Sequence, residues 1–344
     1  MSAEAVEVRR GGRASWVALG ALGVVVVLLA VVVPYQVSLG TLSNLVGLFV
    51  LVILGTTWNL MAGYAGMVSI GQQAFIGIGG YGVIHLSDAV GLPLLAAVGA
   101  AAVLSGLVAW ATSFLVFRLA GGYFAIGTWV VAEVLKLVTG QVDALGGGSG
   151  LSLLAFRGTD RVTRVATVYW LGLALAVLVV LAAYLLMRSR TGLGLTALRD
   201  DPTAAAGLGV PVTRAKRVVY VGSSAAVGLA GALTALTTLR VTPESVFSVQ
   251  FTAAMIFVVL IGGIGTIEGP ILGAVVYFLL EDRLADLGAW YLVVLGLVAV
   301  VVVLVAPRGL WGLLTRVAPI EVFPLSHRVG PRGPVRDAGL PSRT

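Results

Sequence analysis

Two charged residues stand inside a long apolar run and are the first candidates for chemistry. Glu133 and Lys136 interrupt the segment at 122–139. If this segment crosses a membrane, each buried charge costs about 2.5–3.5 kcal/mol, so both are functional candidates by default. Their i, i+3 spacing places them on one helix face, where they can neutralise each other. Two interpretations stay open: part of a substrate path, or a structural pair in which Lys136 reaches the membrane interface.

Glycine interrupts the apolar pattern in both halves of the chain. The first break runs through 63–80 and the second through 262–270. Interrupted spans in corresponding halves are typical of a transporter's substrate path. Polar residues near the breaks either line a pore or bond backbone groups that the breaks free. The broken-helix glycines are Gly63, Gly66, Gly71, Gly262, Gly263, Gly265 and Gly269, and the path candidates are Asn59, Tyr64, Gln72, Gln73, Tyr123, Glu133 and Lys136.

A hydrophilic stretch at 199–211 predicts a short, capped helix of about two turns. Asp201 suits the N-cap, Pro202 suits the first helical position, and Gly209 suits a left-handed C-terminal cap, with Pro211 preventing continuation. So short a helix is marginal in water by itself. Its small residues, at 204–206, let another protein approach closely, as in recognition of a helix in a groove. An ordinary capped connector is the alternative.

The elements that carry these residues are predicted to be membrane helices. The chain of 344 residues is 59% hydrophobic and 11% charged, against about 25% charged in soluble domains. Its apolar runs are continuous and about twenty residues long, which suits helices and exceeds barrel strands. We predict an all-α integral membrane protein, a polytopic helical bundle of about ten spans with broken helices, at 15–34, 41–61, 70–87, 92–117, 122–139, 166–187, 215–239, 250–265, 270–283 and 288–306.

The distribution of Lys and Arg predicts the orientation of this bundle. Most basic residues fall on the side of the two termini and of the loop at 188–214, which places both termini in the cytoplasm. The expected divisions are an N-terminal cytoplasmic segment at 1–14, a transmembrane domain at 15–312 and a disordered tail at 313–344. The basic start before the first span is expected to belong to a retained helix rather than to a signal peptide.

Several function classes are excluded at this stage. The chain has no Cys and two distant His, so we predict no metal site and no Fe–S cluster. The net charge of +7 is explained by loops facing one side of a membrane rather than by nucleic acid. No phosphate-binding loop motif occurs, so we predict a non-enzyme without its own nucleotide site. The G-x-G-x-x-G pattern at 77–82 is interpreted as a close helix contact, as is the small-residue face of Ser224, Gly228 and Ala232.

Several motifs, in order, resemble one family of membrane proteins. The chain is similar to the permease subunits of ATP-binding-cassette importers for branched-chain amino acids, over roughly residues 40 to 312. The matching stretches are NLMAGYAGMVSIGQQAF at 59–75, GYFAI at 122–126 with Glu133, GGSGL at 147–151, Thr191-Gly192, Arg199-Asp200-Asp201, Ala204-Ala205, Leu208-Gly209, Pro243-Glu244-Ser245 and GGIGTIEGP at 262–270.

The resemblance implies a multi-pass subunit in the bacterial cytoplasmic membrane that works with separate proteins. Those partners are two cytoplasmic ATPases that use ATP, a second related permease and an extracytoplasmic solute-binding protein; no cofactor is expected on this chain. Thr203 stands where the family often has Glu, which weakens any salt bridge to the ATPase. The implied coupling residues are Arg199, Asp201, Thr203, Ala204, Ala205 and Gly209. Alternatives are a permease for urea or short amides, an ion-coupled secondary transporter using Glu133, and a structural scaffold.

Overall fold

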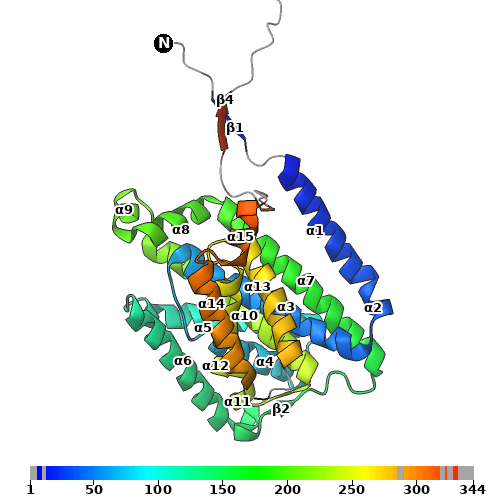
Figure 1. The fold of residues 1–344 in the computed structure, drawn as a ribbon. Helices are drawn as coiled ribbons and strands as arrows, with labels where there is room; N and C mark the ends of the chain where they lie inside the picture. The colour runs from blue at the N-terminus through cyan, green and yellow to red at the C-terminus, as the bar shows by residue number, and fades with distance from the viewer. Residues whose placement is uncertain are drawn as a thin grey trace, which may run out of the picture.

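The computed structural model describes residues 6–9, 13–284, 288, 290–317, 322–323 and 328–331 as a helical bundle (Figure 1). Its elements are β1 (Val6–Arg9), α1 (Arg13–Val31), α2 (Val33–Gln36), α3 (Leu39–Asn59), the π-helix η1 (Leu60–Tyr64), α4 (Gln73–Asp88), α5 (Leu94–Val116), α6 (Gly122–Gln141), the 3₁₀ turns η2 (Asp143–Leu145) and η3 (Gly147–Ser149), β2 (Leu151–Ser152), α7 (Arg161–Arg188), α8 (Arg190–Asp200), α9 (Pro202–Gly207), α10 (Val212–Thr238), β3 (Arg240–Val241), α11 (Pro243–Val246), α12 (Val249–Gly262), α13 (Glu268–Leu284), α14 (Trp290–Val305), α15 (Gly309–Val317) and β4 (Arg328–Pro331).

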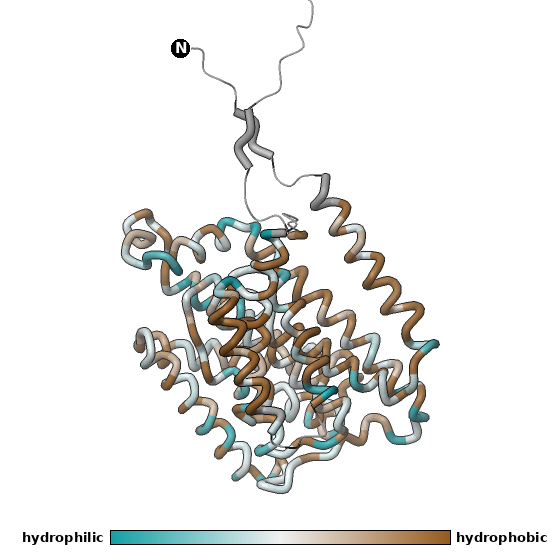
Figure 2. The backbone as a smooth tube through the Cα atoms, in the orientation of Figure 1, coloured by the Kyte–Doolittle hydropathy of each residue, from teal (hydrophilic) through white to brown (hydrophobic). Residues whose placement is uncertain are grey.

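The predicted class of helical, multi-pass membrane protein is confirmed. In the described part of the chain six helical segments are long and apolar enough to cross a bilayer, and a bent pair, Val293–Val305 with Gly309–Arg316, raises the number to seven. The tube in Figure 2 is apolar along these helices and more polar at their connections. The remaining predicted spans fall on shorter helices, α1, α4 and α13. The count of ten spans therefore stays a prediction.

The centre of the bundle is formed by α10 with α3, α4 and α5. Glycines let α4 and α10 meet backbone to backbone. A side chain at Gly79 would collide with the backbone of Gly228, and one at Gly231 would collide with the backbone of Ile76. Such contacts replace the hydrophobic effect as the source of helix association in lipid. The two small-residue patterns of the sequence thus meet each other, as a packing interpretation requires.

The two ends of the bundle carry different elements. We call them the α9 end, with α8, α9 and α15, and the α11 end, with α11 and β2 (Figure 1). The described terminal strands β1 and β4 pair antiparallel beyond the α9 end. At the α11 end β2 pairs antiparallel with β3, and the Leu154 backbone amide donates to the Asp88 carboxylate over 2.7 Å. Both described terminal segments therefore lie at one end of the bundle.

The chain beyond 312 continues the fold. The predicted start of a disordered tail at 313 falls inside α15, which ends at Val317. Farther along, the rings of Phe323 and Tyr184 lie 5.1 Å apart, and the Phe323 backbone amide donates to the Glu268 carboxylate over 2.8 Å. Most of the tail from 318 onward lies outside the described residues. The predicted N-terminal segment at 1–14 is described only at 6–9 and 13–14.

Candidate coupling and translocation site

The predicted short helix forms at the α9 end, with the caps that the sequence indicates. The Asp201 side chain accepts from the backbone amides of Thr203 at 2.8 Å and Ala204 at 3.0 Å. Pro202 opens the helix, and Gly209 has a φ of 83°, in the left-handed region. The cap geometry is therefore confirmed. It follows from local chemistry, since each capping group acts within a few residues of the helix end.

The faces of α9 are not equivalent. Ala205 is 2% exposed and faces the rest of the fold, whereas Ala204 and Ala206 are exposed. Leu208, just beyond the helix, is 83% exposed. The exposed surface at this helix therefore includes Ala204, Ala206 and Leu208, whereas Ala205, also predicted as a coupling residue, packs against the fold.

The two glycine breaks touch each other at the α9 end through Asn59. The Asn59 side-chain amide donates to the Thr266 carbonyl over 2.7 Å, and its oxygen accepts from the Gly265 backbone amide over 2.8 Å. Asn59 is 2% exposed, at the end of α3, where the chain widens into the π-helix η1. Single π-turns are frequent at functional sites. We call this arrangement, formed by Asn59, Gly265 and Thr266, the clasp.

Glycine is needed at two positions for the clasp to form. A side chain at Gly63 would collide with the Asn59 side chain and the Gly265 amide. Gly265 has a φ of 78°, which side chains of L residues rarely adopt. The glycines of the two breaks therefore allow a close backbone approach between segments that lie far apart in the sequence; Asn59 and Gly265 are 206 positions apart.

Arg199 links the loop at 188–214 to the first glycine break, beside the clasp. Its Nη1 donates to the Gly63 carbonyl over 3.0 Å, and its Nε donates to the Asp200 carboxylate over 2.9 Å. The same guanidinium would lie next to any side chain added at Gly265. A charge-assisted bond of this kind is stronger than a neutral one. One residue of α8 thus contacts the first break directly and lies beside the second.

The remaining break glycines mark further close contacts. Gly66 has a φ of 66° and lies beside Arg199, and Gly263 has a φ of 132°. A side chain at Gly71 would collide with the Thr128 backbone, and side chains at Gly262 and Gly269 would collide with the backbone of Gly269 and Gly263, respectively. The glycines of both breaks therefore allow close approaches between backbone segments.

The polar residues Tyr64, Gln72 and Gln73 of the first break are buried, and part of their hydrogen-bonding capacity is unused. Thr252 donates to the Gln73 side-chain oxygen over 2.5 Å, and the Gln72 amide donates to Ser69 over 3.4 Å. Within the described residues, the Gln72 oxygen, the Gln73 amide nitrogen and the Tyr64 hydroxyl have no hydrogen-bond partner. Buried polar atoms normally find one. These three groups of the predicted path are therefore buried with unused hydrogen-bonding capacity.

The charges in α6 do not form the predicted pair. Lys136 Nζ lies 2.7 Å from Glu244 Oε2 on α11, so its ion pair is with Glu244 and not with Glu133. The i, i+3 spacing within α6 favours Glu133 as the partner of Lys136. The sequence does not indicate that α11 lies close to α6 in the fold. Tyr123 is 75% exposed, and it does not join Gln72 and Gln73. Glu244 belongs to Pro243-Glu244-Ser245, one of the stretches that carry the family resemblance, and this is the sequence signal that could have pointed to it.

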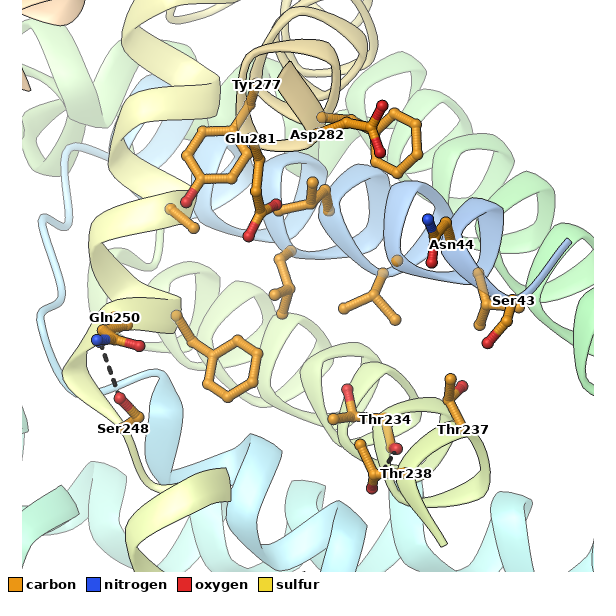
Figure 3. A pocket seen from close by; sticks show the side chains of 18 of the residues that line it. Ser43, Asn44, Thr234, Thr237, Thr238, Ser248, Gln250, Tyr277, Glu281 and Asp282 are labelled. Atoms are coloured by element: carbon orange, nitrogen blue, oxygen red, sulfur yellow. Dashed lines mark hydrogen bonds between the residues drawn. The ribbon is translucent and has the colours of Figure 1, made fainter. Parts of the chain in front are cut away.

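A cavity of about 530 Å³ opens between α3, α10, α12 and α13, toward the α11 end (Figure 3). Its wall mixes apolar side chains with hydroxyl, amide and carboxylate groups. None of the predicted path residues lines it. The polar lining residues are Ser43, Asn44, Thr234, Thr237, Thr238, Ser245, Ser248, Gln250, Tyr277, Glu281 and Asp282. Sequence reasoning missed this cavity because its lining comes from several separate helices without a local motif.

The fold defines the class of helical, multi-pass membrane proteins. Within the described residues no cluster of three or more His, Cys, Asp or Glu gathers to hold a metal ion. The model of the family described as "Branched-chain amino acid transport system / permease component" matches residues 40–303. The chain belongs to this family of transport subunits.

Two curated relatives support the same assignment. The chain is 29% identical over 308 residues to the high-affinity branched-chain amino acid transport system permease protein LivM of Salmonella typhimurium, covering 82% of this chain and 72% of that protein. It is 28% identical over 313 residues to the protein of the same name from Escherichia coli K12, covering 83% and 73%. No solved structure matches the chain.

Proposed function

We propose that the chain is the membrane-spanning permease subunit of an ATP-binding-cassette importer in a bacterial cytoplasmic membrane. It translocates branched-chain or related hydrophobic amino acids, and it works with two ATPases, a second related permease and an external solute-binding protein. ATP is bound and used by the ATPases. Support comes from the family match and from the transport systems named for both relatives.

The observation that carries this proposal is the contact between Arg199 and the first break. A cytoplasmic ATPase needs a rigid route from its docking surface to the membrane helices. Arg199 provides it, because α8 precedes the capped helix α9 and bonds to Gly63 at 3.0 Å. A charge-assisted bond from α8 to the Gly63 carbonyl, beside the clasp, supports a mechanical role for this connection.

The resulting sequence of events follows from the contacts. Closure of the ATPase dimer moves α9 through Ala204, Ala206 and Leu208. The motion reaches Arg199, which shifts Gly63 relative to Gly265. The clasp then opens, and Gln72, Gln73 and Tyr64 become accessible to the solute. Shifts of this size are amplified when a packed interface has two discrete arrangements.

The cavity at the α11 end is the proposed external entrance. Its apolar wall suits a branched side chain, and Glu281 or Asp282 suits an α-ammonium group. Urea and short amides carry no positive charge, so these carboxylates favour an amino acid. An ion-coupled transporter using Glu133 remains the second candidate, since Glu133 is half-buried in α6.

Reconstitution tests the proposal. Proteoliposomes would contain this chain with its mate permease, the ATPases and the binding protein, and labelled leucine uptake would be measured with ATP, without ATP, and with an ion gradient alone. We expect uptake only with ATP and the ATPases. Uptake by the permeases alone under an ion gradient would refute the importer and support the second candidate.

A further inference from the structure

A second cavity lies at the α9 end, between α8 and the start of α10. Its volume is about 630 Å³. It differs from the entrance cavity in its charge. The lining residues are Arg190, Thr191, Leu193, Gly194, Ala197, Leu208, Gly209, Val210, Pro211, Arg214, Ala215 and Val218, which include two arginines and no acid. We call it the α8–α10 groove.

The two arginines of the groove are not neutralised by the fold. Arg190 opens α8 and Arg214 lies in the first turn of α10, and both are exposed. Among the described residues neither has an ion pair; those that form are Lys136 with Glu244 and Arg199 with Asp200. Two unpaired guanidinium groups around one cavity create a site for a phosphate, which guanidinium binds with bidentate geometry. The Thr191 hydroxyl adds a neutral donor.

The rest of the groove is apolar and exposed. Leu193 is 60% exposed, Val218 is 48% exposed, and Leu208 on the rim is 83% exposed. The groove also lies where α7 ends at Arg188 and α10 begins at Val212, the level at which apolar helices give way to a basic connection. A ligand that satisfies both features has an anionic head and an apolar tail. Basic pockets of this kind between helix ends bind anionic lipid head groups.

We propose that the α8–α10 groove binds one anionic phospholipid of the surrounding leaflet. Arg190 and Arg214 hold its phosphate, and Leu193 and Val218 contact the first methylenes of an acyl chain. The lipid would then bridge α8 and α10. This proposal does not depend on which solute the protein transports.

A lipid fits the groove better than free phosphate or a protein partner. Free phosphate makes no use of Leu193 and Val218. A docking ATPase meets the exposed α9 surface of Ala204, Ala206 and Leu208 but needs no unneutralised pair of arginines at the membrane level. Both alternatives are arms of the test below.

The test measures binding of labelled phosphatidylglycerol to the full-length chain in nanodiscs of phosphatidylcholine. The test variant is Arg190→Gln with Arg214→Gln. The matched control is Arg118→Gln with Arg316→Gln, which removes the same charge outside the groove. We expect the test variant to lose about 30-fold in affinity, from two basic residues at a membrane surface, and the control to stay within about twofold of the wild type.

Further arms keep the outcome decisive. Arg190→Lys with Arg214→Lys should bind more tightly than the Gln variant and less tightly than the wild type, because it keeps the charge but loses the bidentate geometry; this variant covers the case in which the Gln variant fails to fold. Equal losses in test and control variants would overturn the site, because they would reveal bulk charge attraction only. Displacement of the lipid by inorganic phosphate would overturn the lipid assignment. Loss of ATPase co-purification with unchanged lipid binding would also overturn it, in favour of a protein interface.

Discussion

Asn59→Leu should weaken the clasp without changing the shape of the site much. The change removes the donor to Thr266 and the acceptor from Gly265, which bond over 2.7 and 2.8 Å. A hydrogen bond contributes about 0.5–1.5 kcal/mol net, so the closed clasp loses about 1–3 kcal/mol. That shift raises the population of the open state about 5- to 150-fold.

Thiol labelling reads out this population. Because the chain has no Cys, a single Ala65→Cys change within the first break gives a clean reporter, and Ala65 is 1% exposed. We expect a membrane-impermeant maleimide, added from the cytoplasmic side, to label the Asn59→Leu reporter at least about fivefold faster than the Asn59 reporter.

The control variant changes a buried polar residue two positions before Asn59 on the same helix, α3. Thr57→Val removes a buried hydroxyl that bonds only to carbonyls of its own helix, Ile53 and Leu54, both at 2.9 Å. Labelling of this control should stay at the Asn59 rate, and thermal melts should rule out general unfolding. Equal labelling rates in Asn59→Leu and wild type would refute the clasp as a closing contact.

Three further predictions concern docking, the ion pair and the entrance. Ala206→Asp should abolish ATPase co-purification with an unchanged melting temperature, whereas Ala205→Asp should lower that temperature because Ala205 is 2% exposed; equal melting curves would contradict this distinction. Lys136→Ala should change the stability by less than about 1 kcal/mol, since Glu244 in its ion pair is 82% exposed, and a larger loss in chemical denaturation would show an essential pair. Glu281→Gln should raise the half-saturating leucine concentration in ATP-driven uptake about fivefold, from roughly 1 kcal/mol of lost charge attraction; an unchanged value would remove Glu281 from the entrance.

The parts of the site that depend on local chemistry are predictable from the sequence. The helix α9 forms with its predicted caps because Asp201, Pro202 and Gly209 act on backbone groups within a few residues. The glycine breaks are also recognisable, since helix-breaking residues interrupt apolar runs that otherwise continue.

The parts that depend on tertiary approach are not predictable in the same way. Asn59 is separated from Gly265 by 206 positions, so no local pattern marks it as a joint between the breaks. Its polar type near a glycine break predicts a path residue. Lys136 pairs with Glu244, 108 positions away, although Glu133 was three residues from it. The entrance cavity has no motif at all, because each wall helix contributes only a few polar groups.

The most direct test of the account measures ATP hydrolysis and leucine uptake together in the reconstituted complex carrying Arg199→Gln. The account predicts that the ATPases still co-purify and hydrolyse ATP while uptake falls at least about tenfold, because a charge-assisted bond of about 1.5–3 kcal/mol to Gly63 is lost. Arg199→Lys should restore part of the uptake. Wild-type uptake per ATP in Arg199→Gln would contradict the claim that this contact carries work from the cytoplasmic loop to the membrane helices.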